Sequence, residues 1–406
     1  MAKGAGRKVY RNVAHAKKMR VKKFFSVLLA LFLLAILVFL GYSVAKPIFN
    51  YFNSEENFSE DSLPWTPPVS EEGHVETEYT ESDDSSQTEV TVVTEAIIEL
   101  SDEFTAYMLP KDALESPAKL AGYINQAKSN GYNAVTVTLK AEGGKIHYAT
   151  ASEFAKSDEN TVVGTMSAEQ ICKIIKDNGL KAFALINLLE DNSRYGENRD
   201  GSYHSIDGST WLDNSVSNGG KPWLSPFENA TIIYVAYITN EIVSSGFDAI
   251  ITDGICFPDF RNSDLNLIGN SVKSQDRYTS LISLITMVSN VTGSRNIMSL
   301  HTFDADDIID NTEEAFKPEH LTEKKLLIEY SSAKIGNTVV YNNSEIILSD
   351  LSEYEKFKTI WTIIKEKAGT EIELIPLIVR SEYNPADYDA IITELISQGH
   401  KSYIVR

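Results

Sequence analysis

Cysteine is scarce in this sequence, which has only Cys172 and Cys256 among its 406 residues. Two cysteines allow one disulfide but do not make the disulfide framework of a small secreted domain. The sequence also has no HExxH motif, no Cys/His cluster with zinc spacing, no GxSxG motif and no P-loop. These absences argue against a zinc enzyme, an α/β-hydrolase and a nucleotide-hydrolysing enzyme, and we expect neither a metal site nor a cofactor.

Positive charge is missing from residues 54–95, which contain no Lys or Arg and are rich in Glu, Ser and Thr. Such a segment has too little apolar surface to offset the entropy lost on ordering, and its negative charges repel one another. We therefore expect residues 46–95 to form an extended acidic linker ahead of a folded domain.

The N-terminal 45 residues contain a basic segment followed by an apolar one. Residues 1–23 carry nine Lys or Arg and no Asp or Glu, and residues 24–45 are uncharged. A helix over 24–45 would span ~33 Å, enough to cross the hydrocarbon core of a bilayer. We predict a single transmembrane helix there, with the basic tail in the cytoplasm and the rest of the chain outside the cell membrane. A cleavable signal peptide is the alternative, because "SVA" precedes Lys46, although signal h-regions are only ~7–15 residues long.

The net charge of the chain indicates which kinds of partner the protein can bind. It is −20 for the whole chain, and about −29 once the basic tail is left out. A surface this acidic repels the phosphates of nucleic acid, which argues against a nucleic-acid partner. It fits a protein that works among cell-wall polymers or other polysaccharides.

Short apolar runs alternate with amphipathic stretches from residue 96 to residue 406, as in repeated βαβ units. We predict helix starts at Ser116-Pro117, at Ser167 and at Asn384-Pro385. Eight strands between such helices predict a (β/α)8 TIM barrel. The alternative, an open doubly wound sheet, would need a glycine-rich turn after its first strand, and "YMLPKDALESP" is not one. The predicted strands are 105–109, 134–139, 182–189, 249–253, 297–301, 326–330, 373–379 and 402–405.

Two carboxylates at predicted strand ends are candidates for catalysis. Barrel enzymes build their active sites at the carboxyl ends of the strands, where Asp253 and Glu329 lie. Hydrolysis of a glycosidic bond needs two carboxyl groups ~5–9.5 Å apart, one protonated and one ionised. We therefore predict that Asp253 is the nucleophile or base and Glu329 the acid. The alternative for Asp253 is an acceptor that anchors a loop.

Further polar residues follow the same strand ends, and we predict that four of them contact substrate: Glu142, Asp191, His301 and Arg380. Each also has a purely structural interpretation. Glu142, Asp191 and the neighbouring Glu190 could be solvated loop charges, His301 could be a hydrogen-bonded core histidine, and Arg380 could form an internal salt bridge.

The longest predicted loop, residues 190–227, holds several aromatic residues among Gly, Asn and Asp. Loops of this length in a compact domain are usually functional or disordered. Aromatic faces can stack on the C–H faces of sugar rings, so we predict substrate contacts for Tyr203, Trp211 and Trp223. The alternative is a lid packed by its own aromatic side chains.

Four blocks of the sequence resemble a family of bacterial barrel proteins of glycosyl-hydrolase type, often membrane-anchored or exported. The blocks are "TAYML", "NAVTVTLKAEGGKIHY", "PWLSPFENATIIYVAYITNEIVSSGFDAIITDGICFP" and "IELIPLIVR". The pattern GFDxIxxDxxxFP is the most specific part. It places Asp253 on the family's strand-end Asp and Phe257-Pro258 on its Phe-Pro.

The sequence departs from the family pattern at several polar positions. Without an Arg beside it, Asp253 would lose the charge that holds a carboxylate ionised and oriented. The resemblance therefore implies either a glycoside hydrolase acting on a cell-wall or environmental polysaccharide, or a non-catalytic barrel that binds a glycan or a surface partner. A chitinase-like site is less consistent, because DxDxE is absent. The departures are Thr138 for Asp, Ala141 and Glu142 for an Asp pair, Leu185 near an Arg, Ser225 for Asp or Asn, Gly254 for Tyr, Cys256 for Arg and His301 for Asp.

Overall fold

The structure, a computed structural model, describes most of the compact unit Ala96–Arg406. The predicted cytoplasmic tail, transmembrane helix and acidic linker, residues 1–23, 24–45 and 46–95, lie outside the described residues. Within the described part of the chain, no helix is both long and apolar enough to cross a membrane. The described residues are 103–152, 155–157, 161–193, 201–268, 272, 277–312, 316–317, 321 and 324–406.

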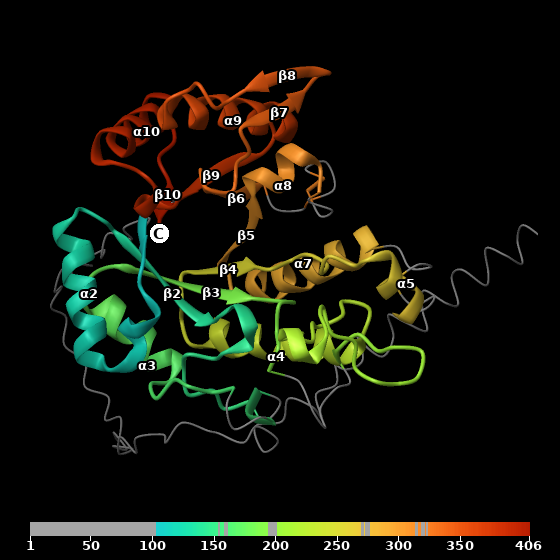
Figure 1. The fold of residues 1–406 in the computed structure, drawn as a ribbon. Coiled ribbons are helices and arrows are strands. Elements are labelled where there is room, and N and C mark those ends of the chain that lie inside the picture. Colours follow the sequence, from blue (N-terminus) through green and yellow to red (C-terminus); the bar gives the residue numbers. More distant parts are fainter. Residues whose placement is uncertain are drawn as a thin grey trace, which may run out of the picture. The chain divides into compact units, whose positions relative to one another are not determined.

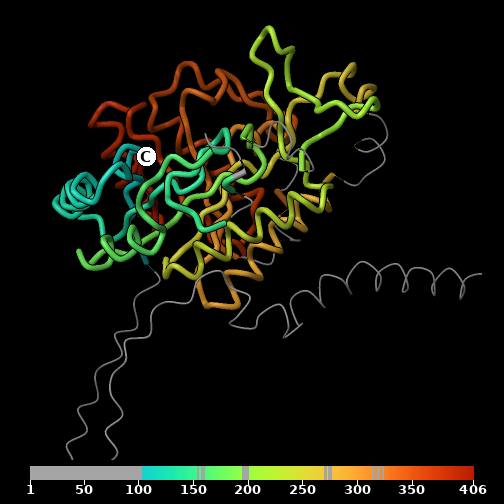
Figure 2. The backbone as a smooth tube through the Cα atoms, turned by 90° about the horizontal axis from the view of Figure 1, so that it is seen from below, coloured from blue at the N-terminus to red at the C-terminus, as the bar shows by residue number. Residues whose placement is uncertain are grey.

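Eight parallel strands close into a barrel in the order β1-β10-β9-β6-β5-β4-β3-β2 (Figure 1). The strand that closes it is β10, which pairs with β1 so that Thr105 lies beside Tyr403. In Figure 2 the red C-terminal end lies next to the blue-green start of the domain. The prediction of a TIM barrel is confirmed and the open doubly wound sheet is wrong. The strands are β1 Thr105–Met108, β2 Ala134–Lys140, β3 Lys181–Asn187, β4 Ala249–Asp253, β5 Met298–Asp304, β6 Lys325–Tyr330, β9 Glu373–Ile378 and β10 Tyr403–Val405.

Helices lie around the outside of the strands (Figure 1), and their first residues carry the expected caps. Ser167 and Gln170 form a capping box, and the side chain of Asn384 accepts a hydrogen bond from Asp387 N. The helices are α2 Pro117–Ser129, α3 Ala168–Asp177, α4 Asn229–Ser244, α5 Asn262–Ile268, α7 Arg277–Gly293, α8 Ala305–Asp310, α9 Glu353–Ala368 and α10 Pro385–Ser397.

The strands separate two layers of buried side chains. The inner cluster includes Phe183, Leu185, Ala249, Ile251, Leu300, Leu327, Ile375 and Ile404. The outer cluster, between strands and helices, includes Val137, Ala184, Ile250, Phe303, Ile328 and Val405. Because successive side chains of a strand face opposite sides, Asp253 shares the inner face of β4 with Ala249 and Ile251.

Strand β5 extends three residues past the predicted end at His301 and reaches Asp304. Its side chains continue to alternate, since Leu300 belongs to the inner cluster and Phe303 to the outer one. The expectation that His301 follows this strand is therefore wrong, because the residue lies in the middle of β5.

A β-hairpin between β6 and α9 has no counterpart among the predicted strands. Strands β7, Thr338–Tyr341, and β8, Ser344–Ile347, pair antiparallel across Asn342 and Asn343. Both asparagines have positive φ, 50° and 60°, as a type I′ turn requires. The hydroxyl of Tyr341 donates to Glu366 Oε2 of α9 at 2.7 Å, which ties the hairpin to that helix.

Candidate active site

Three inward-facing carboxylates meet at the carboxyl ends of β4, β5 and β6. Asp253 ends β4, Asp304 ends β5, and Glu329 lies beside Asp304 in the register of β5 with β6. Glu329 is only 4% exposed, whereas Asp253 is partly exposed. The structure thus brings together the two residues predicted to be catalytic and adds Asp304 to them.

Two cations hold this group of carboxylates. The guanidinium of Arg406, which follows β10, contacts Glu329 Oε1 at 2.5 Å. The amine of Lys334, in the loop after β6, lies 2.9 Å from Asp304 Oδ2 and 3.6 Å from Glu329 Oε1. Positive charge therefore reaches this site from β10 and from the β6 loop, although Cys256 stands where the family pattern has an Arg.

The electrostatics of Asp253 depend on burial and on its neighbours. Burial raises the pKa of Asp253, as does the charge of Asp304, while the hydrogen bond from Gly254 N to Oδ1, at 2.8 Å, and the cations Arg406 and Lys334 lower it in part. Burial likewise raises the pKa of Glu329, and Arg406 opposes that rise. The charges of Asp304 and Asp253 add to the raised pKa of Glu329.

A second pair of carboxyl groups, Glu142 and Glu190, lies on the loops after β2 and β3. Burial first, and then the charge of Glu142, raise the pKa of Glu190 to about 7, with Asp253 adding to the rise and Lys221 opposing it. The backbone of Glu190 is fixed, because its N–H donates to Asn187 Oδ1 at 3.1 Å and its carbonyl accepts from Gly143 N at 2.8 Å. Glu190 is thus a carboxyl group that gives up its proton only near neutral pH.

Asp191 is not a solvated loop charge, because it forms an ion pair inside the protein. Lys140 and Asp191 are 2% and 0% exposed, with 2.9 Å between Nζ and Oδ2. Burial alone would raise the pKa of Asp191, but Lys140 and hydrogen bonds from Ser193 hold it below its ordinary value. The carboxylate is enclosed, which argues against the predicted substrate contact.

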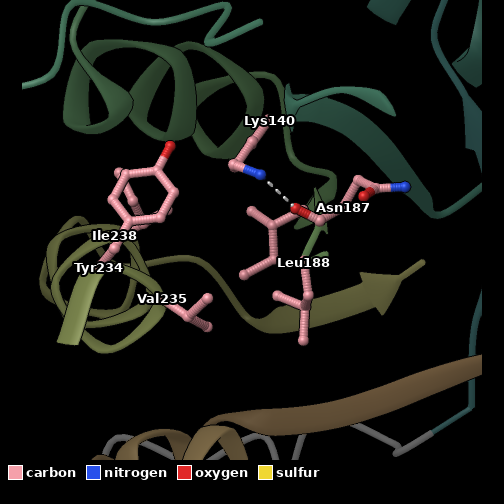
Figure 3. A pocket seen from close by; sticks show the side chains of 7 residues that line it. Lys140, Asn187, Leu188, Tyr234, Val235 and Ile238 are labelled. Atoms are coloured by element: carbon pink, nitrogen blue, oxygen red, sulfur yellow. Dashed lines mark hydrogen bonds between the residues drawn. The ribbon is translucent and has the colours of Figure 1, made fainter. Parts of the chain in front are cut away.

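Lys140 reaches this position because β2 shifts register between Thr138 and Lys140. Its side chain lies between β3 and α4, where the amine donates to the carbonyl of Asn187 at 2.7 Å and lies 5.6 Å from the ring centroid of Tyr234 (Figure 3). The small pocket there leaves no room for a water molecule. It is lined mainly by apolar side chains and is separate from the carboxylates at the strand ends.

Gly254 is a conformational requirement at this end of the barrel. Its φ is +63°, and a Cβ atom there would lie 2.5 Å from both Nδ2 and Oδ1 of the buried Asn187. The interpretation of Gly254 as the site of a lost tyrosine side chain is therefore incomplete, because in this chain the backbone and Asn187 occupy the space.

The aromatic residues of the long loop pack mostly on one another. Tyr203 and Trp211 are each 3% exposed, and their ring centroids lie 5.9 Å apart. Trp211 also packs on Phe260 at 5.0 Å. Trp223 is partly exposed, and its indole N–H donates to Asp213 at 3.2 Å. This arrangement supports the self-packed lid, so that sugar stacking stays a prediction for Trp223 alone.

Figure 2 shows this loop, in light green, projecting beside the yellow segment that contains α5. A backbone hydrogen bond of 2.8 Å from Ile206 N to Leu267 O joins the two. The loop after β4 takes part as well, since the ring centroid of Phe257 lies 5.5 Å from that of Phe227 in the long loop. Phe257 of the family pattern thus helps to hold the lid.

His301 and Arg380 point away from the carboxylates. His301 is fully buried on the outer face of β5, with Nδ1 2.6 Å from Thr252 Oγ1 and Nε2 3.1 Å from Ser289 Oγ of α7. Burial lowers its pKa to about 4, so the ring is neutral. Arg380 is exposed, with its guanidinium 4.8 Å from the ring centroid of Tyr388 on α10. Neither placement supports the predicted substrate contacts.

The remaining sequence candidate, Glu142, is exposed beside Glu190, and its contact with substrate stays a prediction. Cys172 and Cys256 do not form a disulfide. Over the described ranges, no group of three or more His, Cys, Asp or Glu side chains could hold a metal ion.

Replacing Gly254 tests the close approach to Asn187. We expect Gly254→Ala to lower the free energy of unfolding by about 2–4 kcal/mol, combining the cost of a left-handed non-glycine residue with a steric clash. Gly179→Ala is the control, because it has φ +76° but open space around it, and should cost only about 1 kcal/mol. If urea unfolding showed that Gly254→Ala and Gly179→Ala lose the same free energy of unfolding, the clash with Asn187 would be contradicted.

Removing Lys140 tests the buried ion pair. Lys140→Met leaves the Asp191 charge buried without a partner, and should cost about 3–5 kcal/mol of stability. The matched control is Lys173→Met, whose partner Asp177 and own side chain are 60% and 72% exposed, and which should cost at most about 1 kcal/mol. If urea unfolding gave the two variants the same stability, the account of the ion pair would be wrong.

Comparisons with known proteins agree with the barrel. No curated protein matches the sequence at a significant level. The glycoside hydrolase domain of PgaB (BpsB) from Bordetella bronchiseptica is 12% identical, with a TM-score of 0.51, over 75% of this chain and 93% of that one. The catalytic domain of β-amylase from Paenibacillus polymyxa is 12% identical, with a TM-score of 0.47, over 75% and 92% of the two chains. At this identity the likeness to the Bordetella bronchiseptica domain concerns the fold alone.

A family model described as "Putative glycosyl hydrolase domain" matches residues 106–311. The matched range holds Asp253, Asp304, Glu142 and Glu190, while Glu329, Lys334 and Arg406 lie beyond it. Because the match covers half of the sequence, the chain belongs to this family of glycosyl-hydrolase-type domains.

Proposed function

We propose that this protein hydrolyses glycosidic bonds of a cell-wall or environmental polysaccharide at the carboxyl ends of its barrel strands. The observation that carries the proposal is the meeting of Asp253, Asp304 and Glu329 on the inner face of neighbouring strands, in a chain of the glycosyl hydrolase family. Burying carboxylates is costly without a purpose, and this end of a barrel is where such enzymes work.

Asp253 is the proposed nucleophile or base. It is partly exposed, so substrate can reach it. The described part of the chain gives its carboxylate one hydrogen bond, from Gly254 N to Oδ1, which orients the group. Burial raises the pKa of Asp253, and Arg406 and Lys334 oppose that rise and so favour the ionised form that either role needs.

The acid is better assigned to Glu190 than to Glu329. An acid must hold a proton at working pH. Burial raises the pKa of Glu329, but its ion pair with Arg406 opposes that rise and favours the charged form. Glu190 has the opposite surroundings, a partly buried position beside a second carboxyl group. Glu329 would then serve to position Arg406 and Lys334 near Asp253.

A non-catalytic glycan-binding barrel is the second candidate function. The observation that favours it is the ion pairing of Glu329, the residue predicted from the sequence to be the acid, because its cation partners oppose protonation. In that case Asp253 and Asp304 would accept hydrogen bonds from sugar hydroxyls.

We also propose that the barrel works outside the cell, anchored by residues 24–45. The support is the uncharged run behind a basic tail, and the acidic stretch that would separate the barrel from the membrane.

A polysaccharide panel tests the proposed hydrolysis. With the full chain we expect release of reducing ends from one polysaccharide, and a loss of kcat of about 10²–10⁴ in Asp253→Asn, because proton transfer contributes about that much. Asp389→Asn, an exposed residue of α10, should change nothing. Binding without turnover, unaffected by Asp253→Asn, would favour the binding barrel instead.

The pH profile tests the acid. Glu190 must be protonated to donate, so activity should be present below pH 7 and fall as the pH rises through about 7. Glu190→Gln should lose that activity. Glu142→Gln removes the neighbouring charge, so the pKa of Glu190 should fall and the basic limb of the profile should move to lower pH. A limb that stays in place in Glu142→Gln would show that another group is the acid.

A further inference from the structure

We propose that the Thr302 hydroxyl and the Asp253 carboxylate together hold the water molecule that attacks the glycosidic bond, so that hydrolysis inverts the anomeric configuration. This inference rests on the proposed function and assigns Asp253 the role of base in place of nucleophile. It also makes Thr302, which no sequence pattern singled out, part of the site.

Thr302 lies on the inner face of β5. Its neighbours Leu300 and Phe303 belong to the inner and outer clusters respectively, so the alternation of the strand turns Thr302 inward with Leu300 and Asp304. The residue is only 6% exposed. Within the part of the chain that the structure describes, its Oγ1 has no hydrogen-bond partner.

Asp253 is the inward-facing neighbour of Thr302 on β4. Thr252 pairs with His301 in the register of the two strands, so one residue further along Asp253 lies opposite Thr302. Neighbouring strands are ~4.8 Å apart, and the two side chains make no direct hydrogen bond. Two polar side chains that face the same side of neighbouring strands, but do not hydrogen-bond to each other, can be bridged by one water molecule.

Hydrogen bonding favours a water molecule at this place. A buried hydroxyl without a partner costs free energy, and buried polar groups in proteins are usually satisfied by protein or by ordered water. The Thr302 hydroxyl can accept from or donate to water, whereas an ionised Asp253 only accepts. One proton of the bridging water would therefore point at the carboxylate, as a base needs.

The step balances with the groups already described. The water oxygen forms a bond to the anomeric carbon while its proton passes to Asp253. The bond between the anomeric carbon and the leaving oxygen breaks, and that oxygen takes the proton of Glu190. Because the water attacks the face opposite the leaving group, one displacement gives a product of inverted configuration.

A second buried threonine of the inner face supplies the control. Thr136 of β2 is fully buried, and its Oγ1 also has no partner among the described residues. It pairs with Phe183, which in turn pairs with Ala249, so it lies deeper in the barrel than Asp253. Thr136→Val therefore removes a similar hydroxyl from the same core without touching the carboxylates.

The test compares Thr302→Val, Thr302→Ser and Thr136→Val in the full chain, on a polysaccharide that the unsubstituted protein cleaves. Thr302→Val keeps the shape of the side chain, and we expect it to lower kcat about 10–100-fold with little change in KM, because the water is not part of substrate binding. Thr302→Ser and Thr136→Val should keep most of the activity. Proton NMR of the first product released should show an inverted anomer.

A product of retained configuration would overturn this inference while leaving hydrolysis itself in place. So would a loss of kcat in Thr302→Val that is no larger than the loss in Thr136→Val. No turnover of any polysaccharide by the unsubstituted chain would instead overturn the proposed function, and this inference with it. A crystal structure of the protein adds a readout besides activity, since electron density for a water within 3.5 Å of both Thr302 Oγ1 and Asp253 supports the inference and its absence contradicts it.

Discussion

Everything at the proposed site depends on the pairing of β10 with β1, which closes the sheet into a barrel. Closure fixes which face of each strand is inside, and the strict alternation of side chains then decides what meets at the carboxyl ends. Asp253, Asp304 and Glu329 face one another for this reason. Closure also places Arg406, directly after β10, where its guanidinium reaches Glu329 two strands away in the barrel.

Charge at this end of the barrel is arranged in two unlike groups. Glu329 and Asp304 are neutralised by Arg406 and Lys334, so their positions are fixed by ion pairs. Glu190 lies beside Glu142 instead, where burial and the charge of Glu142 raise its pKa to about 7. Asp253 interacts with both groups. Burial raises its pKa and Arg406 opposes that rise, while the charge of Asp253 adds to the raised pKa of Glu190. Two carboxyl groups with opposite surroundings can take opposite roles in acid–base chemistry.

The sequence was informative wherever local pattern determines structure. The eight barrel strands follow from short apolar runs, and helices begin where Ser167 and Asn384 supply caps. Asp253 could be identified because it ends a strand whose position the apolar run defines. The turn at Asn342 and Asn343 was a readable hairpin signal, since asparagine tolerates positive φ, although the flanking strands are short.

Features that depend on contacts between distant segments could not be read from the sequence. Arg406 and Glu329 are 77 positions apart, and nothing local marks them as partners. Whether a carboxylate is solvated or enclosed is likewise a tertiary property. Asp191 and Glu190 are adjacent in sequence, yet one has a lowered pKa in an ion pair with Lys140 and the other a raised pKa beside Glu142. The burial of Tyr203 and Trp211 in the lid belongs to the same class.

The central claim is that a glycan binds over the carboxylates at the strand ends. A structure of the protein with a bound oligosaccharide tests it most directly. The account predicts a sugar ring in contact with Asp253, with a glycosidic oxygen within hydrogen-bond reach of Glu190. An oligosaccharide bound elsewhere, with Asp253 and Glu190 untouched, would contradict it.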